Sequence, residues 1–189
     1  MSYKSPYKID SNIRKADTLK SSFYTDKNIF RNSIEKIFSS TWQYGLDINA
    51  LKSKNIYPID FLPETVCESL VITKNKEEIN CISNVCTHRG HIVCQKHKKG
   101  NNLSCRYHGR SFSLDGKLKN AVGFENSLNF PTPKDNLTEI PLRKWKNFLF
   151  FSLNKDSNNL FALEDIDSRL DKFPFNRLNF SEELSNSFV

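Results

Sequence analysis

Residues 86–118 read CTHRGHIVCQKHKKGNNLSCRYHGRSFSLDGKL, and the interpretation of the whole chain begins with this stretch. It holds two short segments that each combine one cysteine, one histidine and a glycine. They are Cys86-Thr87-His88 with Gly90, and Cys105-Arg106-Tyr107-His108 with Gly109. Each segment follows a run of residues typical of a strand. Because glycine permits tight turns, two such loops can close around one shared centre.

The donor atoms of these two loops favour an iron–sulfur cluster. Cysteine thiolates are the usual ligands of such clusters, and in Rieske centres two histidines replace two cysteines on one of the irons. Cys86 and Cys105 would bind one iron, and His88 and His108 the other. The motif therefore predicts a Rieske-type [2Fe–2S] cluster, held by one cysteine and one histidine from each loop.

Zinc is the alternative that the residue types leave open. Two cysteines and two histidines also suit a tetrahedral zinc ion, as in a zinc-stabilised interaction module. Zinc modules usually pair their first two ligands as cysteines two to four residues apart, whereas each loop here mixes the two types. Metal analysis separates the two interpretations.

The charge, the lack of targeting segments and the number of cysteines limit the classes of protein to which the chain could belong. The 189 residues carry 28 Lys and Arg against 21 Asp and Glu, a net charge of +7, and the basic residues are spread along the chain. Without a basic block, nucleic-acid binding is not expected. No secretory signal or membrane-spanning apolar run is visible. An odd number of cysteines, five, then favours reduced thiols or metal ligands and a cytoplasmic location.

The pattern of apolar residues predicts a mostly β protein. Asp26 is a candidate N-cap for a helix through residues 28–40, and a strand is expected at residues 42–46. Short strand-like runs follow at residues 56–61, 68–73, 78–83, 102–105, 111–114, 137–142 and 147–153, with turns at 75–77 and 115–116. This pattern indicates an antiparallel sandwich or barrel into which a cluster-binding subdomain is inserted. Residues 161–172 are a candidate short helix.

Three segments are expected along the chain. Residues 1–45 form an N-terminal arm and helix, residues 46–153 the Rieske domain, and residues 154–189 a linker and the start of a further domain.

The motif resembles the Rieske region of the large (α) subunits of aromatic-ring-hydroxylating oxygenases. Their pattern runs C-x-H-R-G, then a glycine-bearing loop, then C-x-Y-H-G and an aromatic strand that ends in a glycine turn. His88-Arg89-Gly90, Gly100, Tyr107-His108-Gly109 and Asp115-Gly116 follow that pattern. The resemblance extends from about Phe30 to residue 153. Arg110 departs from it, because these oxygenases commonly carry tryptophan there.

The resemblance implies one-electron transfer as part of an oxygenase. In the family, a C-terminal domain binds a mononuclear iron through two histidines and a carboxylate. Only His91 and His97 remain here beyond the cluster motif, so mononuclear Fe(II) is expected only in a catalytic domain that this sequence lacks. The resemblance also implies a ferredoxin or a flavin reductase using NAD(P)H as electron donor, and a homotrimer. A stand-alone Rieske ferredoxin-like carrier is the alternative, so whether the chain is an enzyme stays open.

Smaller features carry expectations of their own. Cys94 is expected to be a packed thiol rather than a ligand, and Cys67 and Cys81 to lie in the core. Residues 96–99 are a solvated loop tip or a docking surface for an acidic partner. High-potential Rieske proteins of respiratory complexes carry hydroxyl residues where Arg110 and Phe112 stand, and a bonded cysteine pair where His91 and Tyr107 stand. Their absence points to the lower-potential type.

Overall fold

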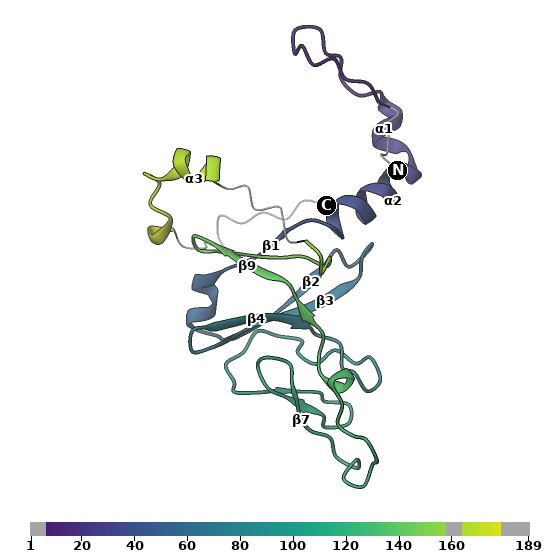
Figure 1. Ribbon diagram of the computed structural model, residues 1–189, viewed down its shortest axis with the longest axis vertical. Coiled ribbons are helices and arrows are strands. Elements are labelled where there is room, and N and C mark those ends of the chain that lie inside the picture. Colours follow the sequence, from purple (N-terminus) through teal and green to yellow (C-terminus); the bar gives the residue numbers. More distant parts are fainter. Residues whose placement is uncertain (1–6, 158–163, 179–189) are drawn as a thin grey trace.

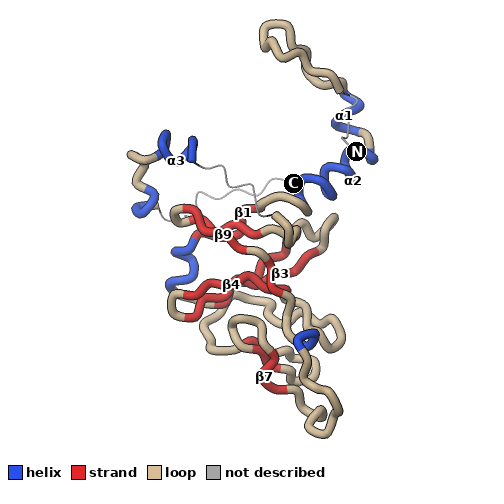
Figure 2. The backbone as a smooth tube through the Cα atoms, in the orientation of Figure 1, coloured by secondary structure: helices blue, strands red, loops and turns tan. Residues whose placement is uncertain are grey.

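The computed structural model describes residues 7–157 and 164–178. Figures 1 and 2 show the β strands stacked in three levels, with two sheets above and a loop-rich unit around β7 below. Within the described residues every strand pairing is antiparallel, so the predicted mostly β, antiparallel architecture is confirmed.

Each level is one small sheet. The upper sheet has the order β1 (Gln43–Asp47), β10 (Phe148–Phe151), β9 (Leu142–Trp145). The middle sheet has the order β2 (Ile56–Phe61), β3 (Glu68–Asn75), β4 (Glu78–Ser83), β8 (Glu139–Ile140). The lower sheet has the order β5 (Leu103–Ser104), β6 (Ser111–Phe112), β7 (Leu118–Asn120). The expected domain boundary after residue 45 falls inside β1.

The middle sheet separates two hydrophobic cores, because side chains alternate between the two faces of a strand. On β3, Leu70 and Ile72 pack upward and Val71 packs downward, and all three are fully buried. The upper core comprises Leu46, Leu51, Leu70, Ile72, Cys81, Leu149 and Phe151. The lower core comprises Ile56, Val71, Ile82, Cys86, Val93, Cys94, Leu103, Cys105, Phe112, Leu114 and Leu137. Both motif cysteines thus belong to the lower core.

The strand predictions hold with two exceptions. Residues 137–142 were expected to form one strand, but Pro141 lacks the N–H that a continuous ladder needs, and the run divides into β8 and β9 in different sheets. β7 was not predicted, because its three residues carry no apolar alternation. The expected turns are confirmed: Asn75 pairs with Glu78, and Gly116 has a positive φ of 86°.

The N-terminal helix is present but is not packed on a core. α1 (Ser21–Thr25) precedes α2 (Lys27–Ser33), whose N-cap Asp26 accepts hydrogen bonds from the backbone N–H groups of Asn28 and Ile29. A π-helical turn, Ile34–Phe38, continues α2. None of these residues is buried, and Figure 1 shows the segment extending away from the sheets.

The remaining helices are short. α3 spans Glu164–Leu170, inside the helix expected at residues 161–172, of which residues 161–163 lie outside the described part of the chain. Single 3-10 turns occur at Ile48–Lys52, Pro133–Asp135 and Phe175–Arg177. Among the described residues, no helix is long and apolar enough to cross a membrane.

The two cysteines expected in the core differ. Cys81 on β4 is buried, and burial raises the pKa of its thiol to about 12. The expectation for Cys67 is wrong, because its side chain is exposed. Cys67 has a positive φ of 56° and lies in the turn between β2 and β3, where its backbone N–H donates to the Leu62 carbonyl.

Candidate metal centre

The two motif loops have the same backbone hydrogen-bond pattern. In the first loop the N–H of Cys86 donates to the carbonyl of His91, and the N–H of Gly90 donates to the carbonyl of Cys86, both at 2.9 Å. In the second loop the N–H of Cys105 donates to the carbonyl of Arg110 at 2.8 Å, and the N–H of Gly109 to the carbonyl of Cys105 at 3.1 Å. Each loop is thus closed at the fourth and fifth residues after its cysteine.

Glycine occupies the fourth position of both loops because the backbone there is left-handed. The φ angles are 68° at Gly90 and 74° at Gly109, a region that side chains with a Cβ rarely adopt. No atom lies within 4 Å of a Cβ built at Gly90, so the requirement at this position is conformational rather than steric.

The two loops bring their side chains together as a cysteine pair and a histidine pair. Cys86 and Cys105 are each 3% exposed and lie in the same buried cluster. The rings of His88 and His108 lie 4.7 Å apart, centroid to centroid, at 68° to each other. The cysteines face the lower core, whereas His88 is half-buried and His108 is exposed. The arrangement is buried at its sulfur end and open at its imidazole end.

The pKa values of the donors follow from this arrangement. Burial, followed by the hydrogen bond and charge of Cys105, raises the pKa of the Cys86 thiol. Loss of hydration, followed by the positive charges of Arg110 and His108, lowers the pKa of His88. A neutral imidazole is the form that binds a metal, so the surroundings of His88 favour the ligating state.

Two asparagines hold the segment between the loops. Asn84 is fully buried, and its side-chain amide both accepts from the N–H of Cys94 at 2.8 Å and donates to the carbonyl of Cys94 at 2.7 Å. Asn55 makes the same pair of hydrogen bonds with Gly100, at 2.9 and 2.8 Å. These bonds fix both ends of residues 94–100 to the middle sheet.

Arg110 lies buried behind the loops, with 4% of its surface exposed. Its Nη1 donates to Thr87 Oγ1 at 3.2 Å and lies 3.3 Å from Asp135 Oδ1. Its guanidinium carbon lies 5.0 and 5.3 Å from the ring centroids of Phe124 and Phe130. A hydrogen bond from the Thr132 N–H lowers the pKa of Asp135, with a further contribution from Arg110, so the carboxylate is ionised.

Phe124, Phe130 and Asp135 were not anticipated from the sequence. They lie 14–25 residues beyond Arg110 in a segment of mostly exposed, irregular backbone, and no spacing rule connects such residues to the loops. Phe124 also contacts His88 edge to face, at 5.7 Å between centroids. The signal available in the sequence was Arg110 itself, a charged residue where the resembling oxygenases carry tryptophan.

The donors present fit a two-iron cluster. The cysteine thiols form one pair and the imidazoles another, which matches a cluster in which one iron takes sulfur ligands and the other takes nitrogen ligands. Within the described residues, no three His, Cys, Asp or Glu side chains form a group that could hold a single metal ion.

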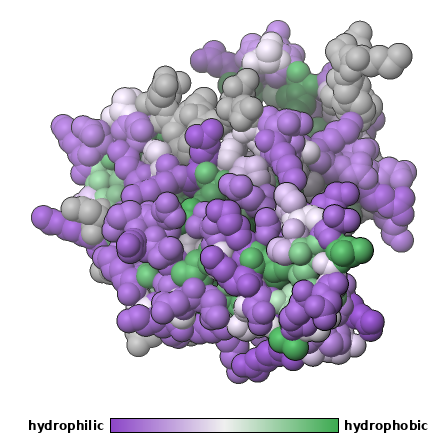
Figure 3. Space-filling view, turned by 60° about the horizontal axis from the view of Figure 1, so that its bottom comes forward, coloured by the Kyte–Doolittle hydropathy of each residue, from purple (hydrophilic) through white to green (hydrophobic). Residues whose placement is uncertain are grey.

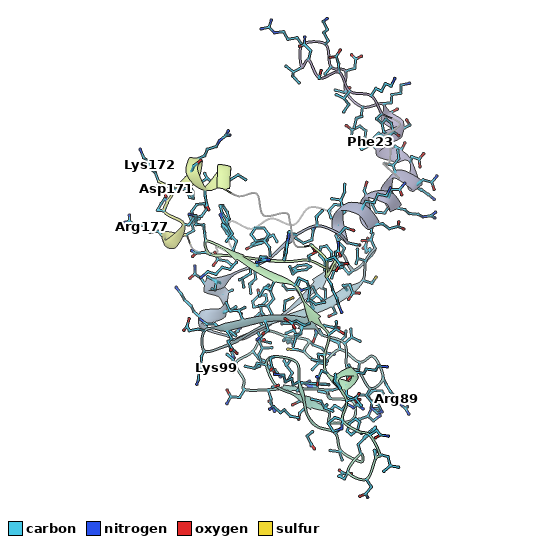
Figure 4. The ribbon with its side chains drawn as sticks, in the orientation of Figure 1. Phe23, Arg89, Lys99, Asp171, Lys172 and Arg177 are labelled. Carbon is cyan, nitrogen blue, oxygen red and sulfur yellow. The ribbon has the colours of Figure 1, made fainter. Side chains whose placement is uncertain are left out.

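The other residues singled out in the sequence have separate places. Cys94 is a buried thiol that donates to the carbonyl of Lys96 at 3.2 Å, as expected of a packed residue. His97 stacks on Tyr57 with centroids 5.4 Å apart, and His91 packs on Tyr107 at 5.7 Å. Residues 96–99 are exposed, and Figure 4 shows Lys99 at the left of the lower level and Arg89 at its right.

Comparison with known families identifies this unit. Residues 42–132 match the family model described as the Rieske [2Fe-2S] domain. This part of the chain is a Rieske [2Fe–2S] domain. The Rieske cofactor expected from the motif is thereby supported, and the matched range contains the cysteine pair, the histidine pair and Asn84.

The relatives of this Rieske domain are oxygenase subunits. The chain is 30% identical over 157 residues to the carnitine monooxygenase oxygenase subunit of Escherichia coli (strain K12), covering 82% of this chain and 41% of that protein. It is 31% identical over 144 residues to the 2-halobenzoate 1,2-dioxygenase large subunit of Burkholderia cepacia, covering 71% and 30%. These matches confirm the resemblance to Rieske oxygenase α subunits. The chain spans less than half the length of either relative.

A solved structure shows the same fold. The apo form of the quaternary ammonium Rieske monooxygenase CntA superposes with a TM-score of 0.72 at 23% identity, covering 82% of this chain and 45% of that one. The likeness shows that this chain shares the fold of the matched part of that monooxygenase.

Proposed function

We propose that this chain is the electron-transferring part of a Rieske oxygenase, with its cluster bound by Cys86, His88, Cys105 and His108. The observation that carries the proposal is the equivalence of the two loops. Identical backbone hydrogen bonds place the two thiols together in the lower core and the two imidazoles together at the surface. When bound, a Rieske cluster accepts and gives up one electron.

The cysteines and the histidines have different roles in binding the cluster. The buried cysteines keep water from the sulfur end, which protects it from hydrolysis and oxidation. His108 is exposed and His88 is half-buried beside it, so an electron can enter or leave through the His108 edge. Figure 3, which brings the lower end forward, shows hydrophobic surface bordered by hydrophilic residues. The exposed apolar side chains of this end are Tyr107, Val122 and Leu128.

The partners are inferred from the relatives. The proposed donor is a ferredoxin or a flavin reductase that uses NAD(P)H. The proposed acceptor is a mononuclear iron bound by two histidines and a carboxylate of another domain or subunit. Supporting this, His91 and His97 of this chain are engaged with Tyr107 and Tyr57. The solved structure of a related quaternary ammonium Rieske monooxygenase gives insights into inter-subunit electron transfer. This supports assembly of several copies of the chain, which we propose to be a homotrimer.

The cluster and its ligands are tested by metal and sulfide analysis of the protein purified without oxygen. We expect two irons and two acid-labile sulfides per chain and a Rieske-type EPR signal after reduction. Cys86→Ala and Cys105→Ala should abolish the signal, whereas Cys94→Ala, which removes a buried thiol of the same core, should keep it. Stoichiometric zinc without labile sulfide would instead establish the zinc module.

The role in an oxygenase is tested by turnover. The reductase-reduced chain should be reoxidised by a generic electron acceptor and should convert none of a panel of aromatic and quaternary ammonium compounds. Product should appear when a catalytic domain from a relative is supplied, in cis or as a second chain. Product from the 189-residue chain alone would contradict the proposal, and reoxidation with no response to any catalytic domain would favour a stand-alone carrier.

A further inference from the structure

Arg110 is the one buried residue of the two loops that carries a fixed positive charge. A guanidinium stays protonated at any physiological pH, and burying a charge is costly unless it is paired and hydrogen-bonded. Arg110 is 4% exposed, whereas the neighbouring arginines of the same loops, Arg89 and Arg106, are exposed. A charge kept at this cost needs a physical role.

The contacts of Arg110 join three segments of the chain. Its Nη1 donates to the hydroxyl of Thr87, the residue between the proposed ligands Cys86 and His88. The same hydroxyl donates to the backbone carbonyl of Asp135 at 2.7 Å, and the Asp135 carboxylate pairs with Arg110. Through its carbonyl, Arg110 accepts the N–H of the proposed ligand Cys105. The cation therefore touches both loops directly and is tied to the segment around Asp135.

The place of Arg110 in the loop is also informative. It is the fifth residue after Cys105, as His91 is the fifth residue after Cys86, and each of the two closes its loop by its carbonyl. The side chains then differ: His91 packs on Tyr107 at the surface, whereas Arg110 turns inward over Phe124 and Phe130. The rings displace water from the guanidinium, and a desolvated charge acts over a longer range than a hydrated one.

We propose that Arg110 is a buried cation that tunes the cluster, holding its reduction potential above the value that a neutral side chain at this position would give. The proposal rests on the function proposed above. Reduction adds one electron to the cluster and leaves Arg110 unchanged, so a positive charge buried behind the loops stabilises the reduced state relative to the oxidised one. The negative charge of the Asp135 carboxylate has the opposite effect and lowers the reduction potential. The ion pair therefore holds the potential between the value with Arg110 alone and the value with Asp135 alone.

The test measures the midpoint potential of four variants by voltammetry or EPR-monitored titration, on the full chain with its cluster. Arg110→Gln should lower the equilibrium constant for one-electron reduction about tenfold, which corresponds to a midpoint about 59 mV lower. Arg110→Lys keeps the charge and should stay within about threefold of the unmodified protein. Asp135→Asn should shift the midpoint upward. Arg106→Gln is the matched control: it removes an exposed charge of the same loop, which water screens, and should change the constant less than about twofold.

The opposite directions of the two expected potential shifts distinguish electrostatic tuning by Arg110 from a purely structural role. If Arg110 only holds the loops together, Arg110→Gln and Asp135→Asn break the same ion pair and should move the potential in the same direction or leave it unchanged. Either result would overturn the proposal, and so would equal shifts for Arg110→Gln and Arg110→Lys. If Arg110→Gln fails to keep the cluster, the upward shift of Asp135→Asn and the retained potential of Arg110→Lys decide the matter. An unmodified protein without labile sulfide would instead refute the proposed function.

Discussion

At the scale of single residues, Asn84 shows how a buried polar group can position a site that it does not enter. Its amide satisfies both backbone groups of Cys94 and also donates to Ser69 Oγ at 3.2 Å. Buried backbone groups need such partners, since an unpaired one costs about 1–3 kcal/mol. Asn84 therefore ties the start of the segment between the loops to β3 through Ser69 and keeps that segment next to the middle sheet.

Asn84→Ala should lower the free energy of unfolding by about 2–4 kcal/mol, because the N–H and C=O of Cys94 lose their partners inside the protein. Denaturant unfolding of the cluster-containing protein measures the loss, and the iron content after dialysis measures whether the loop still retains its metal. Asn101→Ala, at an exposed position of the following loop, should cost less than about 0.5 kcal/mol. Equal stability of the two variants would mean that water replaces the Asn84 amide.

The individual residues of the site were predictable to different degrees. The proposed ligands stand out because mixed Cys/His pairs beside glycine are a local pattern, readable within a few residues. Cys67 was misplaced because a single apolar-looking residue beside a strand does not reveal a turn with positive φ. Asp135 and Phe124 could not be found, because contacts across 14–25 residues of irregular chain leave no periodic trace.

At the scale of elements, the turn at residues 113–117 shows how local electrostatics stabilise a hairpin. Asp115 accepts hydrogen bonds from the Ser113 hydroxyl and the Lys117 N–H, and its carboxylate lies 2.8 Å from Lys117 Nζ. These contacts, Lys117 first, lower the pKa of Asp115 to about 2. The turn leads from β6, which follows the second loop, into β7.

The stabilising effect of Asp115 should depend on pH in one direction. A carboxyl whose pKa is lower in the folded protein stabilises the fold when ionised, so its contribution is complete above the unfolded pKa near 4 and is lost as the pH falls toward 2. The side chain is 35% exposed, so screening limits the contribution to about 1 kcal/mol or less. The difference in unfolding free energy between the unmodified protein and Asp115→Asn should be constant from pH 7 to pH 4 and shrink below pH 4. A difference that grows on acidification would contradict this account.

Elements were predicted best where two local signals agree. The strands β2, β3 and β4 combine apolar alternation with a clear turn, and all three lie where the sequence placed them. Helix α2 and the π-helical turn that continues it were found from the N-cap, yet their apolar residues Phe30 and Ile37 are 56% and 52% exposed. The periodicity of apolar residues identified the helix. The local sequence does not show which surface, in this chain or in another, packs against its apolar face.

At the scale of the whole molecule, the structure favours a low reduction potential. Hydroxyl donors to the cluster region are absent at the two positions where high-potential Rieske proteins carry them, and Phe112 is fully buried in the lower core beside both motif cysteines. A midpoint toward the negative end of the Rieske range, roughly −150 mV rather than +300 mV, is expected. Arg110 would raise it from a still lower value.

Phe112→Tyr should raise that midpoint if the new hydroxyl reaches a cluster sulfur, because a hydrogen bond to sulfur stabilises the added electron. Voltammetry of the unmodified protein and the variant measures both values. A strongly positive midpoint in the unmodified protein would contradict the assignment to the low-potential type. Retention of the EPR line shape in the variant controls for damage to the site.

The division into two cores has a consequence for how the protein comes apart. β3 sends Leu70 and Ile72 to the upper core and Val71 to the lower one, and β4 divides Cys81 and Ile82 in the same way, so the middle sheet is shared by two packing units. The lower unit contains both cysteines and little regular structure, whereas the upper unit consists of paired strands. Stripping the metal should therefore melt the lower unit first and leave a folded remnant around β1, β3 and β10. Unfolding should therefore stop being cooperative once the iron is removed, and the chelator-treated protein should unfold in two separate steps.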